Sequence, residues 1–431
     1  MTFALLMIAL SIQFHDPDTL VVRANNPPVW GEGVELIEEL RIGALDGPEV
    51  YTFGSISGVA IGPDQSVYIG DGQAPAIRQY ADGGAWIANV GRQGQGPGEY
   101  NLISGLRMLE GGPLALLDQR NGRVTYYIDG EYSNSYLSLS GLFTADPYAV
   151  DTAGGSYVKT VIRDAAKPPS AEEPWEMGWI HFDRTGQVQD TLRIPPGDEV
   201  GGGFVLSGLG GYYRPFTVMT VSTMSPHGYL VVCRNDRYAL SRPLPDGRVL
   251  SIERDVERVP VRPEEKDQWN AWIDYFKRRG RESGSNASYG PIPDAKPYVR
   301  HLFVDDDGRI WVAVYAEARF EPYAEAERAQ RGDRPSLEWN QPSVWEVFDP
   351  RGQFLGRVTL PDKTSLAAAR RNTVWGVQAG EYGEGQAVRF RIRSGERTLD
   401  LSAAGTMRGT METSPDGATW TRLFEAVYKR R

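Results

Sequence analysis

The sequence predicts an all-β fold: a six-bladed β-propeller closed by an N-terminal strand, with a helical insertion and a small C-terminal β-hairpin appendage. Two observations lead to this prediction. A unit of four short strand-like runs recurs along the chain, and the 431 residues include 49 glycines and 29 prolines. Such a supply of turn-forming residues is typical of many short strands joined by tight turns.

The clearest copy of the unit spans residues 56–90. Its four strand-like runs are Ile56–Ile61, Ser66–Gly70, Ala76–Tyr80 and Trp86–Val90. Pro63-Asp64 and Asp82-Gly83 supply turns between them, because these residue types favour turn conformations. Four short antiparallel runs with turns at this spacing predict one propeller blade.

The unit then recurs with changes in length. Four further copies cover residues 102–139, 148–194, 216–259 and 298–360, and a sixth is expected to start at Asn372. The sixth copy has no outer strand on its C-terminal side. We expect residues 34–42 to supply that strand, because closure of the ring removes open sheet edges.

Several of these segments resemble the NHL repeat. The resemblance rests on Ser66–Asp71 with Ala76–Tyr80, and on Asp307–Val312 with Phe348–Gly352. Gly91–Tyr100 is similar to a segment of bacterial exported six-bladed β-propellers of unknown function. The resemblance covers about residues 34–393 and implies the fold, but it implies no particular ligand.

The chain is expected to divide into three parts. Residues 1–25 are expected to be a signal peptide and leader, 30–393 the propeller, and 394–431 the appendage. Phe3–Ile12 is an apolar run too short to span a bilayer, which favours export to a periplasmic or extracellular location. No basic residue precedes the run and no clear cleavage site follows, so a buried or frayed N-terminal segment is the alternative.

Two other stretches do not follow the blade pattern. Residues 263–280 predict a helix that begins at Pro263, with Trp269, Trp272, Ile273 and Phe276 on one face. This aromatic face either covers the propeller or lines a ligand cleft. Residues 321–331 predict a second helix, and Thr406–Glu412 with Thr419–Tyr428 predict the C-terminal hairpin.

The long connections predict which face of the propeller is functional. Turns between strands 1 and 2, and between strands 3 and 4, are all short. The long segments are Gly91–Asn101, Asp164–Glu176, Pro195–Pro215, Arg262–Pro297 and Glu317–Pro342. All of them join strands 2 and 3 or successive blades, so they share one face. We therefore expect a monomeric binding scaffold that holds a protein, peptide or glycan on this loop-rich face; neutral surface insertions are the alternative.

Composition and motifs narrow the other classes of function. The net charge of −10 disfavours nucleic-acid binding, and the single cysteine, Cys233, excludes an internal disulfide. Neither a G-x-S-x-G nor an H-E-x-x-H motif is present, so whether the protein is an enzyme stays open. Fold analogy leaves one alternative, a metal-dependent hydrolase, lactonase or lyase with its site at the central channel.

The candidate ligand-binding residues are those expected near the channel mouth on the loop-rich face. They are Tyr148, Tyr213, Arg214, Lys296, Tyr298 and His301. Basic side chains could hold an anionic group and tyrosines could stack on a sugar. Packing and loop anchoring are the alternative roles.

No cofactor is predicted, although Ca²⁺ would suit the enzymatic alternative. Asp71 and Asp118 each end a second strand and are the only metal-ligand candidates. The alternative is that each carboxylate accepts hydrogen bonds from the backbone of the next turn. Gly91–Glu99 lacks the ending of a phosphate-binding loop and is expected to be an inter-blade turn; Asp305–Gly308 is expected to be a turn between strands 1 and 2.

Overall fold

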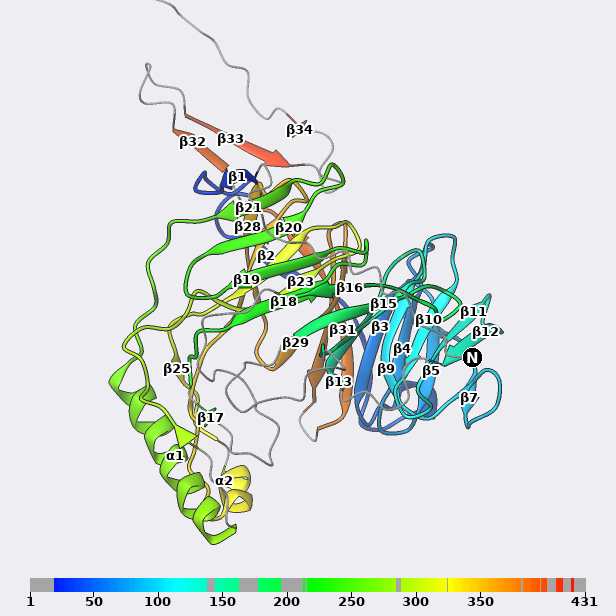
Figure 1. Cartoon of the computed structure of the whole chain (residues 1–431), viewed down its shortest axis with the longest axis horizontal. Coiled ribbons are helices and arrows are strands. Elements are labelled where there is room, and N and C mark those ends of the chain that lie inside the picture. Colours follow the sequence, from blue (N-terminus) through cyan, green and yellow to red (C-terminus); the bar gives the residue numbers. More distant parts are fainter. Residues whose placement is uncertain are drawn as a thin grey trace, which may run out of the picture.

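The computed structural model describes residues 19–137, 144–162, 177–194, 212–213, 215–283, 288–323, 325–380, 383–395, 397–400, 408–413 and 420–421. Within these ranges the chain forms six sheets that each contain a four-stranded antiparallel meander, arranged as the blades of one propeller (Figure 1). The predicted fold is confirmed.

The blades follow one another along the chain, and each has its innermost strand first. The first three are β3 (Ile56–Ile61), β4 (Val67–Asp71), β5 (Ala76–Tyr80) and β6 (Trp86–Val90); β9 (Ile103–Met108), β10 (Leu114–Asp118), β11 (Arg123–Ile128) and β12 (Glu131–Leu137); and β13 (Thr144–Val150), β14 (Ser156–Val161), β15 (Met177–Phe182) and β16 (Val188–Arg193). The fourth and fifth are β18 (Thr220–Met224), β19 (Leu230–Arg234), β20 (Ala239–Pro243) and β21 (Val249–Glu253); and β23 (Val299–Val304), β24 (Ile310–Val314), β27 (Ser343–Phe348) and β28 (Phe354–Leu360).

The sixth blade is closed by the N-terminal strand, as the sequence predicts. It consists of β29 (Thr364–Arg370), β30 (Thr373–Ala379), β31 (Gly385–Arg393) and β2 (Glu35–Ile42). β2 runs antiparallel to β31, from the pair Glu35–Arg393 to the pair Ile42–Ala387. Each of the six blades thereby has four strands, and β2 joins the N-terminal part of the chain to the last blade of the ring.

The predicted start of the sixth blade at Asn372 is wrong, because β29 precedes it as the innermost strand. The run Thr364–Arg370 contains three consecutive alanines, and Thr364 is its only β-branched or aromatic residue. Its strand conformation comes from pairing with β30 and not from local propensity. A further strand, β1 (Thr19–Arg23), lies parallel to β21 on the outer edge of the fourth blade.

The hydrophobic core lies between neighbouring blades. Six clusters of buried apolar side chains fill the six interfaces around the ring. A second strand faces two interfaces at once: Leu114 and Leu116 of β10 pack toward the first blade, whereas Ala115 and Leu117 pack toward the third. For this reason second strands read as continuous apolar runs and do not alternate with polar residues.

The long connections join second to third strands or one blade to the next, so they leave the same side of the sheets. They carry α1 (Pro263–Ser283), α2 (Glu325–Arg331) and three two-stranded pairs. The pairs are β7 (Arg92–Gln93) with β8 (Glu99–Tyr100), β17 (Tyr212–Tyr213) with β22 (Ser288–Tyr289), and β25 (Arg319–Phe320) with β26 (Trp339–Asn340). In Figure 1, α1, α2, β17 and β25 lie at the lower left and β7 at the right. The prediction of one elaborated face is confirmed for these segments. Residues 164–176 and most of 195–215 lie outside the described residues.

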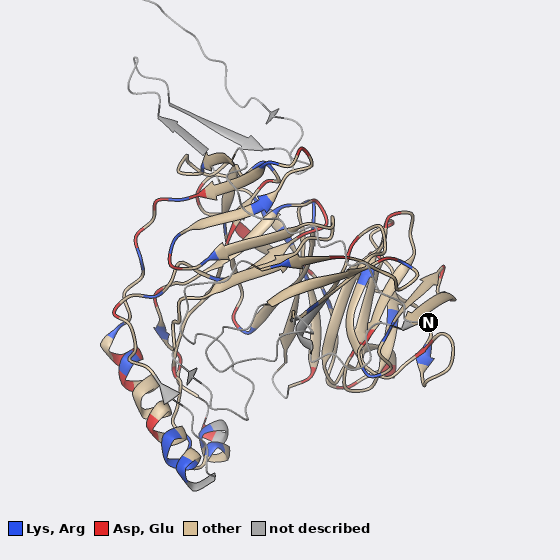
Figure 2. Ribbon diagram, viewed as in Figure 1, with Lys and Arg blue, Asp and Glu red and all other residues tan. Residues whose placement is uncertain are grey.

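Both predicted helices and the C-terminal hairpin are present. Acidic and basic residues are spread along α1 and over the loops of both faces (Figure 2), and the outer strands β2 and β31 also carry them. The appendage includes β32 (Arg397–Asp400), β33 (Arg408–Thr413) and β34 (Trp420–Thr421), and β33 pairs with both of the others. Neither α1 nor α2, the helices of the described part of the chain, is long and apolar enough to cross a bilayer.

Candidate functional site

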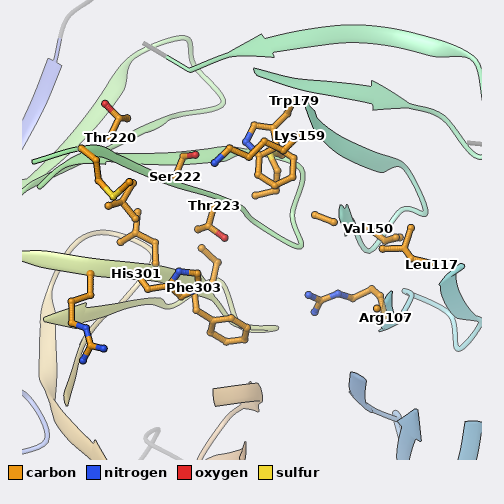
Figure 3. A pocket seen from close by; sticks show the side chains of 18 of the residues that line it. Arg107, Leu117, Val150, Lys159, Trp179, Thr220, Ser222, Thr223, His301 and Phe303 are labelled. Atoms are coloured by element: carbon orange, nitrogen blue, oxygen red, sulfur yellow. The ribbon is translucent and has the colours of Figure 1, made fainter. Parts of the chain in front are cut away.

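A cavity of about 460 Å³ occupies the central channel. It is walled by the innermost strands of the second to fifth blades, β9, β13, β18 and β23, and by side chains of β10, β14 and β15 (Figure 3). Its polar lining side chains are Arg107, Lys159, Trp179, Thr220, Ser222, Thr223, Arg300 and His301. Volume and mixed lining are those of a pocket for a small molecule.

One end of this cavity is crossed by an ion pair. Arg107 Nη1, near the end of β9, lies 2.5 Å from Asp306 Oδ1 in the turn after β23. These residues belong to the second and fifth blades, which stand opposite each other in a ring of six. The pair therefore spans the channel on the side of the short turns.

Backbone hydrogen bonds also connect neighbouring blades on that side. The N–H of Glu110 donates to the carbonyl of Thr152, the N–H of Thr152 donates to that of Pro226, and the N–H of Asp306 donates to that of Ala369. They are 3.0, 2.7 and 3.1 Å long. The short-turn side is thus tied across the ring and between three pairs of neighbouring blades. We refer to the opposite, loop-rich end of the channel as its entrance.

Arg300 and His301 lie near that entrance, because β23 starts on the loop-rich side. The guanidinium of Arg300 stands 5.7 Å from the ring centre of Tyr315. Tyr315 packs edge-on against Phe216 at 5.8 Å, and Phe216 contacts Trp269 of α1 at 6.4 Å. This run of aromatic contacts attaches α1 to the mouth of the channel.

The third blade contributes the most unusual group, Lys159. It lies directly opposite Trp179 in the β14–β15 register, and its ammonium stands 6.0 Å from the indole ring centre. Figure 3 shows its side chain extending toward Ser222 on the fourth blade. No carboxylate pairs with Lys159 among the described residues, and burial lowers the pKa of its ammonium.

Two further polar atoms of the lining lack a hydrogen-bond partner among the residues that the structure describes. They are Trp179 Nε1 and Ser222 Oγ. Trp179 is completely buried, so its N–H has no access to bulk solvent. A buried N–H without an acceptor is costly, and this one lies in the wall behind the cavity, on the residue that faces Lys159 across the β14–β15 register.

Of the predicted ligand-binding residues whose side chains the structure describes, His301 is the one that lines this cavity. Its ring packs edge-on against Trp345 at 6.2 Å. Burial lowers the pKa of His301, and the positive charges of Lys159 and Arg300 lower it further. The imidazole is therefore neutral at pH 7, and its two nitrogens offer one donor and one acceptor.

Two other predicted ligand-binding residues, Lys296 and Tyr298, do not line the central cavity. Lys296 is fully buried, with its ammonium 2.8 Å from Glu265 Oε1 and 2.8 Å from the carbonyl of Ala316. Tyr298 lines a second cavity of about 630 Å³, which residues of β20 and β21 also line. Arg214 and the side chains of Tyr148 and Tyr213 lie outside the described residues. Ligand binding by these residues stays a prediction.

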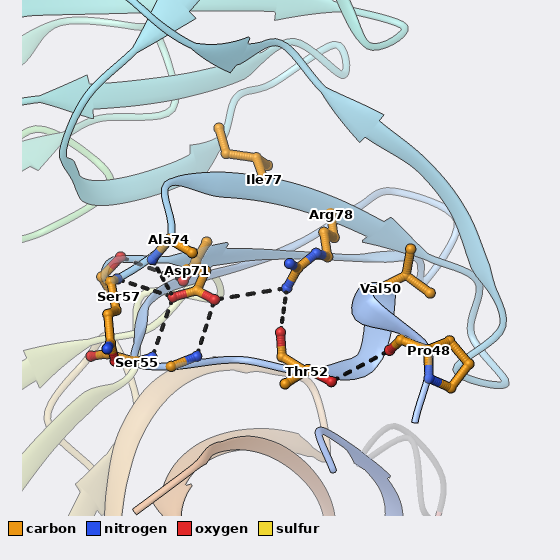
Figure 4. Close-up of polar contacts among 12 residues, drawn as sticks. Pro48, Val50, Thr52, Ser55, Ser57, Asp71, Ala74, Ile77 and Arg78 are labelled. Carbon is orange, nitrogen blue, oxygen red and sulfur yellow. Dashed lines mark hydrogen bonds and ion pairs between the residues drawn. The ribbon is translucent and has the colours of Figure 1, made fainter. Parts of the chain in front are cut away.

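Asp71 and Asp118 are occupied by the backbone. Asp71 accepts hydrogen bonds from the N–H groups of Gly54, Ser55, Gln73 and Ala74, as Figure 4 shows in part. Asp118 accepts hydrogen bonds in the same way from Asn101, Leu102 and Asn121. Each carboxylate thus joins the entry of an innermost strand to the turn that follows the second strand. Asn235 repeats this arrangement in the fourth blade, where it accepts from the N–H of Met219.

No group of three or more His, Cys, Asp or Glu side chains in the described ranges is placed to hold a metal ion. The segment Asp305–Gly308 forms the predicted turn between β23 and β24, in which Asp305 accepts hydrogen bonds from the N–H groups of Asp307 and Arg309. Gly91 and Gly98 have φ values of 63° and 71°, so the glycine-rich segment forms the predicted inter-blade turn.

The sequence contains one indication of the cavity site, a lysine in a buried second strand, and our prediction did not use it. Second strands of the blades are buried, as the burial of β10 and β24 shows. A lysine in the second strand Ser156–Val161 departs from that pattern, and the chain has only seven lysines. Trp179 and Ser222 gave no such signal, because tryptophan is common in strands and a single serine in a strand marks no site; only the packing of the third blade against the fourth brings them together.

No family model matches the sequence, and no curated protein matches it. Among solved structures, a member of the DUF4221 family from Bacteroides vulgatus is similar over 84% of this chain and 99% of its own, with 11% identity and a TM-score of 0.50. A Bacteroides fragilis protein described as a "Putative exported protein" is similar over 87% and 99%, with 10% identity and a TM-score of 0.45.

A virginiamycin B lyase from Staphylococcus aureus is similar over 83% of this chain and 99% of its own, with 9% identity and a TM-score of 0.36. At identities this low, similarity concerns the fold alone. Together with the six sheets described above, the comparison with the DUF4221 protein leads to one conclusion: this chain is a six-bladed β-propeller, and its solved structural neighbours include Bacteroides proteins of unknown function.

Proposed function

We propose that this protein is a binding module that receives its ligand in the central channel through the loop-rich face. The observation that carries the proposal is a cavity of about 460 Å³ that the Arg107–Asp306 pair crosses at the opposite end. Loops on a rigid scaffold are common binding sites, and here they surround the entrance. The ligand is a small molecule, or the end of a peptide or glycan chain, that enters past α1.

A channel-filling variant tests this function. Thr220 lines the cavity at the start of β18, so Thr220→Trp would fill the entrance. Thr359→Trp places the same side chain at an exposed position of the outer strand β28 and serves as the control. The readout is the melting temperature measured with a panel of small carboxylates, phosphates, sugars and short peptides.

Compounds that stabilise the wild type and the Thr359→Trp variant, but not the Thr220→Trp variant, would support the channel site. Equal stabilisation of all three proteins would show that the compounds bind elsewhere. If no compound of the panel stabilises the wild type, the small-ligand form of the proposal fails, and the loop-rich face would bind a macromolecule instead.

We also propose that the protein is exported. The support is the apolar run Phe3–Ile12 near the N-terminus, which has the length of a signal-peptide core. N-terminal sequencing of protein from separated cell fractions tests this. Processed protein outside the cytoplasm is the expected result, and unprocessed Met1 in the cytoplasm would contradict it.

A further inference from the structure

We propose that the channel site binds the anionic group of a small molecule, a carboxylate, phosphate or sulfate, through Lys159, with Arg300 and His301 as further hydrogen-bond donors. This inference rests on the proposed function and specifies the class of ligand. It starts from the chemistry of the lining: the polar groups of the cavity include three cationic side chains, and no Asp or Glu is among the described residues that line it.

The three cationic groups differ in whether their charge is already compensated. Arg107 is paired with Asp306, so its charge is neutralised. Arg300 lies over the ring of Tyr315, and no carboxylate pairs with it or with Lys159 among the described residues. The cavity therefore keeps an excess of positive charge within a chain whose net charge is −10. A walled pocket of one charge sign concentrates ions of the opposite sign.

The hydrogen-bonding groups indicate the same type of ligand. The ammonium of Lys159 and the guanidinium of Arg300 can only donate, and the neutral imidazole of His301 can donate through one nitrogen. Charge-assisted hydrogen bonds from such donors to an anionic group are the strong ones.

The cost of keeping Lys159 where it lies supports a role in binding. Lys159 is half-buried, and this partial desolvation lowers the pKa of its ammonium, so the charged form carries a cost in the folded state. Lys159 also opposes the charging of His301 across the cavity, so two blades direct cationic groups toward one space. An anion bound there would relieve both effects.

The rest of the lining describes the body of the ligand. Leu106, Leu117, Val150, Met219 and Phe303 give the cavity apolar walls. Its volume of about 460 Å³ is within the range of small-ligand pockets. The expected ligand thus combines one anionic group with an apolar or aromatic body, as in an aryl carboxylate or an aryl phosphate.

Matched pairs of probes test the charge requirement by isothermal titration calorimetry. Benzoate is compared with benzyl alcohol, and phenyl phosphate with phenol, so that each pair differs mainly in the anionic group. Inorganic phosphate and sulfate show whether an anion binds without an attached apolar or aromatic group. Wild-type protein is expected to bind at least one aryl anion more than tenfold tighter than its neutral partner.

Three variants assign that preference to a residue. Lys159→Met removes the ammonium and keeps an apolar side chain of similar length, and it should weaken anion binding about tenfold or more while leaving binding of the neutral probes unchanged. Lys159→Arg should retain most of the affinity. Lys363→Met removes the same charge at an exposed position outside the cavity and should change nothing.

The outcomes separate this inference from the proposed function. Anions and neutral probes that bind equally, with both lost in Thr220→Trp, would overturn the anion site but keep the channel as the binding site. Anion binding that persists in Lys159→Met but is lost in Thr220→Trp would overturn the role of Lys159. Binding that is unchanged in both variants would overturn both proposals, and no binding of any anion by the wild type would overturn the anion site.

Discussion

Glu265 of α1 and Lys296, in the segment before the fifth blade, form an ion pair 2.8 Å long whose side chains are 1% and 0% exposed. Glu265 Oε2 also accepts a hydrogen bond from the N–H of Arg262, and Lys296 donates to the carbonyl of Ala316. The pair therefore fixes the start of α1 to the loop-rich face, beside the entrance of the channel.

Removing one member of this pair leaves the other charge buried and uncompensated. Lys296→Met should lower the free energy of unfolding by about 3 kcal/mol. The double variant Lys296→Met/Glu265→Gln should recover part of that loss, because the remaining buried group is neutral. Chemical denaturation monitored by tryptophan fluorescence measures both.

The exposed pair Lys266–Asp294 is the control, since it joins α1 to the same segment with an ammonium-to-carboxylate distance of 2.6 Å. Its aspartate is almost fully solvated, so Lys266→Met should change stability very little. An equal effect of the two lysine substitutions would contradict a buried anchor at Lys296.

The Arg107–Asp306 pair should stabilise the closed end of the channel. Both side chains are about one quarter exposed, so the coupling free energy between them should be on the order of 1 kcal/mol. A double-mutant cycle with Arg107→Gln and Asp306→Asn measures it. A coupling near zero would show that the pair does not hold the two blades together, whatever the single variants do to stability.

Fold and site differ in how far the sequence could predict them. Turn residues such as Pro63-Asp64 and Asp82-Gly83 act locally, so the blade pattern could be read directly. β29 is a strand because β30 pairs with it, and the local conformational preference of its alanines did not predict a strand. The convergence of Lys159, Ser222 and His301 is less local still, because it depends on the order of three blades around a ring.

Asp71 should matter for stability through the backbone groups that it binds. Asp71→Ala leaves the N–H groups of Gly54, Ser55 and Gln73 without their acceptor and should cost about 2 kcal/mol of unfolding free energy. Asp71→Asn should cost less, because an amide oxygen still accepts. Asp362→Ala, at an exposed position, is the control and should have no measurable effect.

The carboxylate of Asp71 is also a candidate metal ligand, so the effect of metal removal on stability should be measured with the Asp71 variants. We expect the wild-type melting temperature to stay constant when EDTA is added and when Ca²⁺ is restored. A decrease with EDTA that Ca²⁺ reverses, and that Asp71→Asn abolishes, would favour the metal-dependent alternative.

His301 should make stability depend on pH. Its pKa is lowered in the folded chain, first by burial and then by Lys159 and Arg300, from an ordinary value of 6.5. Between these two pKa values the unfolded chain binds more protons than the folded chain, so stability should fall as pH falls from about 6.5 through the folded pKa. His301→Gln should flatten this part of the profile.

Urea denaturation at a series of pH values measures that profile, with His227→Gln as the control for a histidine outside the cavity. Direct titration of the histidine ring signals by NMR gives the pKa itself. A His301 pKa at or above 6.5, or a profile that His301→Gln leaves unchanged, would contradict the electrostatics inferred for the cavity.

Lys159→Met should make the ligand-free protein more stable. Because the pKa of Lys159 is lowered by burial, the charged form at pH 7 carries a cost in the folded state that methionine removes. Methionine also fills the space of the aliphatic chain against Trp179. Lys363→Met has no such cost to remove and should leave the free energy of unfolding unchanged. A gain in stability coupled to a loss of anion binding is the expected signature of a residue retained for its site and not for the fold. If Lys159→Met were destabilising instead, the ammonium would be contributing to the fold, and its unpaired state in the cavity would no longer indicate a ligand.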